Sequence, residues 1–231
     1  MKKLGLIGGT SWHSTLEYYS DINQGVNEHY KSNTNPPLRL INLNQKQLHD
    51  LQRENDWDAI ANIFGEAAIE LESVSVDAIA LCANTPHKVF DQLQQSVSCP
   101  IIHIADAIGE HLNANEFQKV GLLGTRFTMS EDFIKGRLSA EYEITTLVPS
   151  KAEQEQIQQL LYSKLSIGVY DDETREIFLK VINNLAEQGA QAVILGCTEF
   201  PLLLKDSKSP IPVVDSLQCH TKSLISFILS D

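Results

Sequence analysis

The chain has 231 residues, of which 42% are hydrophobic, enough to bury a large core in one domain or in two of about 100 residues each. Its formal charge is −12, from 18 basic and 30 acidic residues, so it has no basic surplus for phosphate groups. This excludes nucleic acid as an expected partner. Apolar runs such as Val76–Cys82 fall far short of the roughly 20 residues that cross a bilayer, which excludes a membrane segment.

The amino-terminal stretch and the cysteines predict the cellular compartment. The apolar part of Met1–Gly9 is too short for a signal peptide and runs into a glycine turn, so we expect a cytoplasmic protein. Thiols stay reduced there, so all four cysteines are expected as thiols and none in a disulfide. The lack of a C-x-x-C pair argues against structural zinc.

Short β-rich runs alternate with segments of helical period, which predicts an α/β fold with mainly parallel sheets flanked by helices. The first half is predicted to contain, in chain order, a strand at Lys3–Gly8, a helix at Ser14–Tyr30, a strand at Leu38–Leu43, a helix around Trp57–Leu71 and a strand at Asp77–Cys82. The second half is predicted to contain strands at Lys119–Leu123, Glu143–Leu147, Gln191–Leu195 and Ile211–Val214, with helices from about Ser130, at Glu153–Leu165 and at Asp172–Gln188. A final amphipathic helix carries Leu224 and Ile228.

An internal repeat organises these elements. Three pairs of segments match in the same order: Leu4–Thr10 with Val120–Thr125, Asp77–Leu81 with Gln191–Leu195, and Pro100–Asp106 with Pro210–Asp215. The repeat predicts two similar half-domains, residues 1–103 and 104–214, with a helix over 215–231 that can pack on the first. If the halves face each other, the carboxyl ends of their strands place an active site in the cleft between them.

Glycine turns follow the first strand of each half. Gly8-Gly9-Thr10-Ser11-Trp12 opens a helix, and Gly124-Thr125-Arg126 stands at the equivalent place. The G-x-G-x-x-G fingerprint is absent, so a nucleotide cofactor is not expected. Two interpretations of these turns are open. Each is a tight strand-to-helix connection with a capping side chain, or its backbone N–H groups surround a bound anion. Two such turns at one cleft would suit a dicarboxylic substrate.

A cysteine ends one strand of each half. Cys82-Ala83-Asn84-Thr85-Pro86-His87 follows the strand of the first half, and Gly196-Cys197-Thr198-Glu199-Phe200-Pro201 follows that of the second. A lone cysteine at such a place is usually a small buried hydrophobe. Two cysteines at corresponding ends of a repeat, each followed by small polar residues, favour chemistry instead.

These motifs resemble the aspartate/glutamate racemase superfamily, whose signatures are a Cys followed closely by Asn-Thr, and Gly-Cys-Thr followed by an acidic residue. The likeness extends from the Gly-Gly-x-Ser-Trp turn to Val214-Asp215-Ser216. It implies racemisation of aspartate or glutamate without pyridoxal phosphate or metal, by proton transfer between Cys82 and Cys197. Thiols suit this role because their pKa lies near 8.5 and is easily shifted. Family members often dimerise, so a homodimer is expected.

The resemblance also implies a set of substrate-binding residues. Donors aimed at the substrate carboxylate must stabilise the charge that develops as the α-proton leaves. The candidates for this grip are Ser11, Trp12, Asn84, Thr85, Thr125 and Thr198. Arg53 and Arg126 are cations that could receive a distal carboxylate, although Arg53 could equally lie in a solvated loop.

The register of the repeat leaves the role of Cys82 open. The offset between Asp77–Leu81 and Gln191–Leu195 puts Cys197 opposite Ala83, so Cys82 would point away from the cleft unless a bulge turns it back. Otherwise Cys197 works opposite a hydroxyl such as that of Thr85, or against water.

Several other residues have two readings each. Glu199 and Asp215 could orient or activate a thiol, or Glu199 could cap the following helix. His87 and His220 could contact a site, but a lone histidine more often lies on a helix surface or in the core. Cys99 and Cys219 are read as structural.

Rival functions remain at this point. The same scaffold could racemise hydantoins, decarboxylate a malonate or isomerise a dicarboxylate. A ligand-binding protein with a decayed racemase site is the rival from another class.

Overall fold

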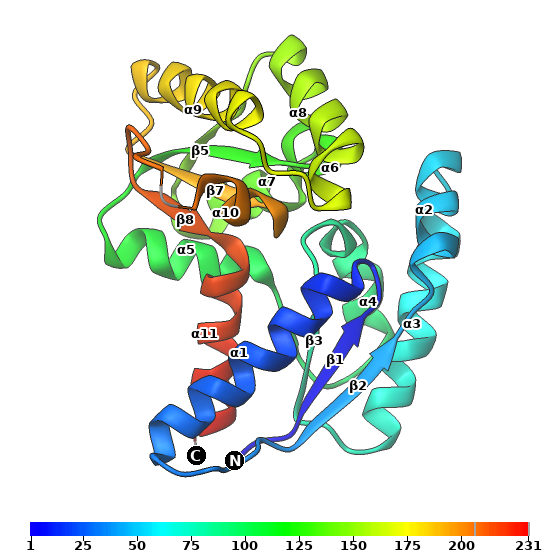
Figure 1. The fold of residues 1–231 in the computed structure, drawn as a ribbon. Coiled ribbons are helices and arrows are strands. Elements are labelled where there is room, and N and C mark those ends of the chain that lie inside the picture. The colour runs from blue at the N-terminus through cyan, green and yellow to red at the C-terminus, as the bar shows by residue number, and fades with distance from the viewer. Residues whose placement is uncertain (206, 231) are drawn as a thin grey trace. The chain divides into compact units, whose positions relative to one another are not determined.

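The computed structural model describes residues 1–205 and 207–230, and these form two compact units. The first unit is residues 1–103 together with the segment from His220 onward, and the second is residues 104–219 (Figure 1). The last helix, α11 (Ser216–Leu229), therefore begins in the second unit and continues into the first. None of the helices in the described ranges is long and apolar enough to span a membrane.

The first unit is built on a parallel sheet with strand order β2-β1-β3-β4. Its strands are β1 (Leu4–Gly8), β2 (Leu38–Asn42), β3 (Ala78–Leu81) and β4 (Ile101–Ile102). Its helices are α1 (Trp12–Tyr30), α2 (Gln45–Glu54), α3 (Trp57–Ser73), the 3-10 helix η1 (Thr85–Val89) and α4 (Phe90–Ser96). Helices α1 and α3 cover opposite faces of this sheet (Figure 1).

The second unit repeats the plan with the order β6-β5-β7-β8, again parallel. Its strands are β5 (Lys119–Gly124), β6 (Thr145–Leu147), β7 (Ala192–Gly196) and β8 (Val213–Asp215). The helices are α5 (Ile104–Ala114), α6 (Arg126–Ser130), α7 (Asp132–Tyr142), α8 (Lys151–Ser163), η2 (Leu165–Ile167), α9 (Asp172–Glu187), α10 (Glu199–Leu204) and the start of α11.

The predicted α/β class with mainly parallel sheets is confirmed, and the two sheets share one strand order. The sequence patterns do not predict α2, α4, α5 or α6, whereas the helix expected after Glu199 is present as α10. The last strand is predicted at Ile211–Val214, whereas β8 is Val213–Asp215.

Alternation along β7 explains how one strand serves two cores. Val193 and Leu195 join the core packed on α8, α9 and α10, while Ala192 and Ile194 join the core packed on α5 and α7. Successive side chains of a strand point to opposite faces, so a strand buried on both sides is apolar throughout. In the first unit, Leu81 likewise faces the α3 core.

The turn after β1 depends on Gly9. Its φ of 91° is in the left-handed region, and a Cβ there would collide with the backbone of Leu43. The Gly9 N–H donates to Thr15 Oγ1 at 3.0 Å, and that hydroxyl donates to Ser11 O at 2.9 Å. The turn is thus fixed by contacts within its own unit.

We expect Gly9→Ala to lower the free energy of unfolding by more than about 3 kcal/mol, because it combines a strained φ with a backbone collision. Gly168→Ala is the matched control, since Gly168 has a φ of 79° but nothing within 4 Å of the added Cβ. This control should lose only about 1–2 kcal/mol. Urea denaturation measures both variants, and equal losses would contradict the packing account.

Candidate active site

Cys82 follows β3 at the carboxyl edge of the first sheet. Leu81 pairs with Ile7, so Cys82 comes beside Gly8, and its N–H donates to Ile7 O at 2.9 Å. In the second unit Gly196 pairs with Gly124. Cys82 therefore occupies the place of Gly196, one residue before the place of Cys197, as the sequence register indicates. Its side chain is 2% exposed.

The residues after Cys82 turn directly into η1. Asn84 and Thr85 are both buried, and Pro86 stands near the start of the helix, where its missing N–H costs little. Ser14 Oγ, on the buried side of α1, donates to Cys82 O at 2.6 Å. This contact ties the cysteine to the glycine turn, because the Ser14 N–H donates to Ser11 Oγ at 3.5 Å.

The structure thus brings Ser11 close to Cys82 through Ser14, a residue that sequence reasoning missed. A pair of serines three residues apart after a glycine turn is the signal that could have found it. Trp12 differs from Ser11, because it is the first residue of α1 and the residue is 54% exposed.

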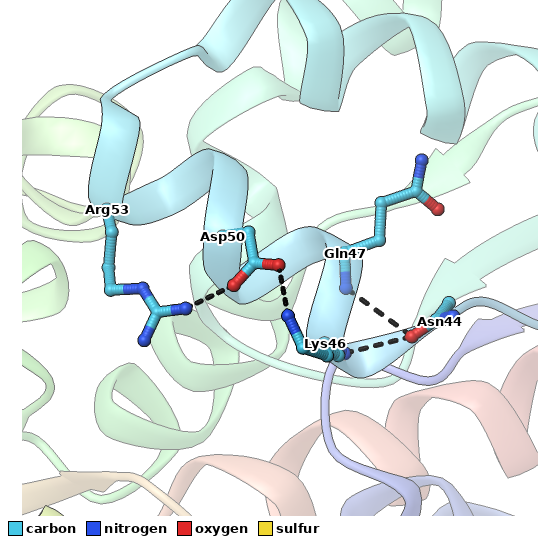
Figure 2. Close-up of polar contacts among 5 residues, drawn as sticks. All are labelled: Asn44, Lys46, Gln47, Asp50 and Arg53. Carbon is cyan, nitrogen blue, oxygen red and sulfur yellow. Dashed lines mark hydrogen bonds and ion pairs between the residues drawn. The ribbon is translucent and has the colours of Figure 1, made fainter.

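Arg53 lies in the last turn of α2 and not in a loop, while its side chain is exposed to solvent as that alternative expected. Figure 2 shows why the helix forms and where the arginine points. Asn44 Oδ1 accepts hydrogen bonds from the N–H groups of Lys46 and Gln47 at 3.0 and 3.4 Å, which caps the helix. Asp50 accepts from Lys46 Nζ at 2.7 Å and forms an ion pair with Arg53 (Figure 2).

One face of α2 forms a surface hollow lined by Gln45, Lys46, His49, Asp50 and Arg53. Burial lowers the pKa of His49, while a hydrogen bond with the backbone of Thr10 acts in the opposite direction. Arg53 is one helical turn beyond His49, on the same face. The arginine is thus carried by a helix that contacts the glycine turn.

Cys197 follows β7 at the carboxyl edge of the second sheet. It packs against the same core as Leu195, and its Sγ donates a hydrogen bond to Glu199 Oε2 at 2.8 Å. Thr198 Oγ1 donates to the same oxygen at 3.1 Å. Glu199 is the first residue of α10, and Thr198 occupies the N-cap position, so Glu199 is not the cap.

The second glycine turn lies beside Cys197, because Gly124 and Gly196 are paired across β5 and β7. Thr125 caps α6, accepting from the Thr128 N–H at 3.3 Å. The Arg126 N–H donates to Gln158 Oε1 at 2.7 Å, and the Arg126 side chain lies over the Phe127 ring. Each unit thus gathers its own set of predicted residues at one sheet edge.

Other candidates have clear local roles. Asp215 Oδ1 accepts from the N–H groups of Leu217 and Gln218 at 2.9 and 3.4 Å, at the start of α11. His87 and His220 are buried in the first unit beneath the Cys82 segment, with His103. Among residues 1–205 and 207–230, no three His, Cys, Asp or Glu side chains are grouped to hold a metal ion.

The sequence matches the family model described as Asp/Glu/hydantoin racemase over residues 7–224. The chain belongs to this family.

Similar racemases occur in several organisms. The broad specificity amino-acid racemase RacX of Bacillus subtilis is 26% identical over 178 residues, covering 77% of this chain and 76% of RacX. The structure of an Asp/Glu racemase candidate from Yersinia pestis is 35% identical over the full length of both chains, with a TM-score of 0.94. That of an aspartate racemase homologue from Pyrococcus horikoshii is 34% identical over both full lengths, with a TM-score of 0.86. Membership of this racemase family indicates an isomerase, and the family acts on small amino-acid substrates.

The two thiols of this racemase differ in what surrounds them. Burial raises the pKa of the Cys82 thiol above its ordinary value. Burial also raises the pKa of Cys197, and the negative charge and hydrogen bond of Glu199 raise it further. Both groups are therefore thiols near neutral pH in the unliganded protein.

We expect Glu199→Gln to lower the pKa of Cys197, because it removes the carboxylate charge that disfavours the thiolate. Since only the thiolate is alkylated, the rate of Cys197 alkylation by iodoacetamide near pH 8 should rise roughly tenfold. Site-resolved mass spectrometry measures the rate against pH, with the exposed Glu187→Gln as the control. An unchanged Cys197 profile in Glu199→Gln would contradict this electrostatic coupling.

Proposed function

We propose that this racemase interconverts the L and D forms of an acidic amino acid, aspartate or glutamate, by two-base proton transfer at the α-carbon. Cys82 and Cys197 are the proposed bases, acting on opposite faces of that carbon without pyridoxal phosphate. The observation that carries this proposal is the hydrogen bond from Cys197 Sγ to Glu199 Oε2 at 2.8 Å. A buried core cysteine does not need a carboxylate at its thiol.

Glu199 supplies a way to form a thiolate in a buried place. Moving the Cys197 proton onto Glu199 produces a thiolate and a neutral carboxyl group, so the number of negative charges is unchanged. A buried site disfavours added charge, so this exchange costs less than releasing the proton to water. The thiolate can then remove the α-proton, while a thiol on the other face donates one.

The first unit supplies the other proposed base and most of the proposed binding groups. Cys82 is held by the Ser14 bond to its carbonyl, next to the buried Asn84 and Thr85. With Ser11 and Trp12, these residues are the proposed donors and walls for the α-carboxylate. Thr125 and Thr198 are the corresponding groups of the second unit. Such donors stabilise the charge that spreads onto the carboxylate as the α-proton leaves.

Arg53 is proposed to receive the distal carboxylate. The guanidinium is already paired with a carboxylate, that of Asp50, and its side chain is 75% exposed. An incoming dicarboxylic substrate would exchange one carboxylate partner for another. The name of one similar protein, an aspartate racemase homologue, supports an acidic substrate, whereas the broad specificity of RacX does not favour any one side chain.

The first test is solvent deuterium exchange. The protein is incubated in D2O with each enantiomer of aspartate and of glutamate, and the α-proton signal is followed together with chiral product analysis. We expect exchange with appearance of the opposite enantiomer, reduced by Cys197→Ala at least 10²-fold, the usual contribution of a general base. Cys99→Ala is the matched control and should retain activity. No exchange with any of the four substrates would overturn the proposal.

Cys82→Ala separates a two-thiol mechanism from a one-thiol mechanism. We expect it to abolish inversion in both directions, because no group remains to protonate the second face. The enantiomer whose α-proton faces Cys197 should still exchange that proton with solvent and keep its configuration. Full inversion in both directions would show that a hydroxyl or water, and not Cys82, opposes Cys197.

A further inference from the structure

Three histidines and a tyrosine are buried together in the first unit, behind the Cys82 segment. His87, His103, His220 and Tyr18 are 1%, 3%, 0% and 1% exposed. The ring centroids of His87 and His103 are 4.5 Å apart, and those of His87 and His220 are 5.8 Å apart. We call these four residues the imidazole cluster. Burying polar rings costs free energy unless their nitrogen and oxygen atoms form hydrogen bonds, and an aliphatic side chain would fill the same space without this cost.

The hydrogen-bond partners of the cluster fix which ring nitrogen carries the proton. His87 Nδ1 lies 3.0 Å from Ala83 O and 3.2 Å from Asn84 O, and carbonyl oxygens only accept. His87 must therefore carry its proton on Nδ1. His220 Nε2 lies 3.1 Å from Ile102 O, so His220 carries its proton on Nε2. Its Nδ1 then accepts from Tyr18 OH at 2.7 Å.

Side chains hold three consecutive backbone carbonyls at the end of β3. Ser14 Oγ donates to Cys82 O, and His87 Nδ1 donates to the carbonyls of Ala83 and Asn84. The backbone N–H of His87 also donates a hydrogen bond to Asn84 O at 3.1 Å. Fixing these carbonyls fixes the peptide planes that follow Cys82. The direction in which the chain leaves the strand is therefore determined by Ser14 and His87.

The rest of the cluster keeps the His87 ring in place. His103 packs on it and is itself packed against Phe90, with ring centroids 4.6 Å apart. His220 is anchored at both nitrogens, to Tyr18 on α1 and to Ile102 on β4. Burial, with a smaller contribution from His87, lowers the pKa of His220 to about 3, so this ring is neutral at ordinary pH.

We propose that His87 is a positioning residue, which fixes the chain at the end of β3 and so holds the Cys82 thiol in place for proton transfer. This role rests on the function proposed above. His87 acts through the Ala83 and Asn84 carbonyls and does not itself contact the reacting atoms. Reactions of this kind are sensitive to placement, because a displacement of about 1 Å can reduce the rate about 10²-fold.

The proposed hydrogen bonds from His87 Nδ1 to the Ala83 and Asn84 carbonyls are tested without any measurement of activity. Long-range NMR correlations in protein labelled with ¹⁵N-histidine report the tautomer of each ring, and variants assign the seven histidines. We expect the Nδ1–H form for His87 and the Nε2–H form for His220. Neutral imidazole in water favours Nε2–H, so the His87 result is diagnostic. A neutral His87 with its proton on Nε2 would overturn the proposal, because its Nδ1 could not donate to the Ala83 and Asn84 carbonyls.

The effect of His87 on proton transfer is tested with two substitutions, one that keeps a hydrogen-bond donor at the position of Nδ1 and one that removes it. His87→Asn places its amide nitrogen where Nδ1 stood, whereas His87→Leu fills similar space without a donor. We expect His87→Leu to lower kcat for inversion on the order of 10²-fold with KM little changed, and His87→Asn to restore most of the loss. The decisive readout is the ratio of exchange with retention to inversion, which should rise in His87→Leu because a displaced Cys82 no longer protonates the second face.

Leu93→Ala is the stability control. Leu93 is fully buried in α4 of the same unit, and its truncation should lower the urea midpoint of unfolding without touching the carbonyls after β3. Its ratio of exchange with retention to inversion should equal that of the unmodified protein. If His87→Leu only matches this control, or if His87→Asn is no better than His87→Leu, the positioning role is wrong. If the unmodified protein inverts no acidic amino acid, the proposed function is wrong. The tautomer measurement still tests whether His87 donates to the Ala83 and Asn84 carbonyls.

Discussion

The parallel pairing of β1 with β3, and of β5 with β7, is the constraint on which the site depends. Paired parallel strands end at the same edge of a sheet, so the loops that follow them come side by side whatever their sequence. In the first sheet this joins the glycine turn to Cys82, and in the second it joins Thr125 to Cys197. Residues far apart in the chain thereby become neighbours before any side-chain contact forms.

The two halves share a plan but differ in where their strand-end cysteines lie. Cys82 occupies the place of Gly196, and Ala83 occupies the place of Cys197. Neighbouring strand residues face opposite sides, so the two thiols are presented differently by their sheets. Cys197 has a carboxylate partner in Glu199, whereas burial alone raises the pKa of Cys82. In the proposed two-thiol mechanism, such inequality would favour a different kcat in each direction, although the equilibrium constant between enantiomers is unity.

Much of the fold could be predicted from the sequence, because its strands and most of its long helices have a recognisable local pattern of apolar residues. Short apolar runs predict β1, β3, β5 and β7, and the repeat between the halves predicts two similar half-domains. Helix α2 was missed because it buries only Leu48 and depends on the Asn44 cap. Helix α5 was missed because it follows a strand of two residues with almost no connecting loop.

The site residues were partly predictable for a similar reason. The two cysteines and their polar followers stand out as motifs at strand ends. Contacts made through space leave no such signal. Nothing in the sequence says that His87 reaches the carbonyls of Ala83 and Asn84, or that Tyr18 reaches His220. Those contacts depend on helix packing, which a periodic pattern does not describe.

The position of the last helix has a consequence for how the first unit assembles during synthesis. The Lys2 N–H donates to Ile228 O at 2.9 Å, Tyr18 OH bonds with His220, and Gly25 has no side chain where Ile225 approaches. Lys2 and helix α1 thus contact residues that leave the ribosome after the whole second unit. All core residues of the second unit are synthesised before the end of α11, so this unit can fold first. Until α11 is complete, the face of α1 that packs against it stays exposed.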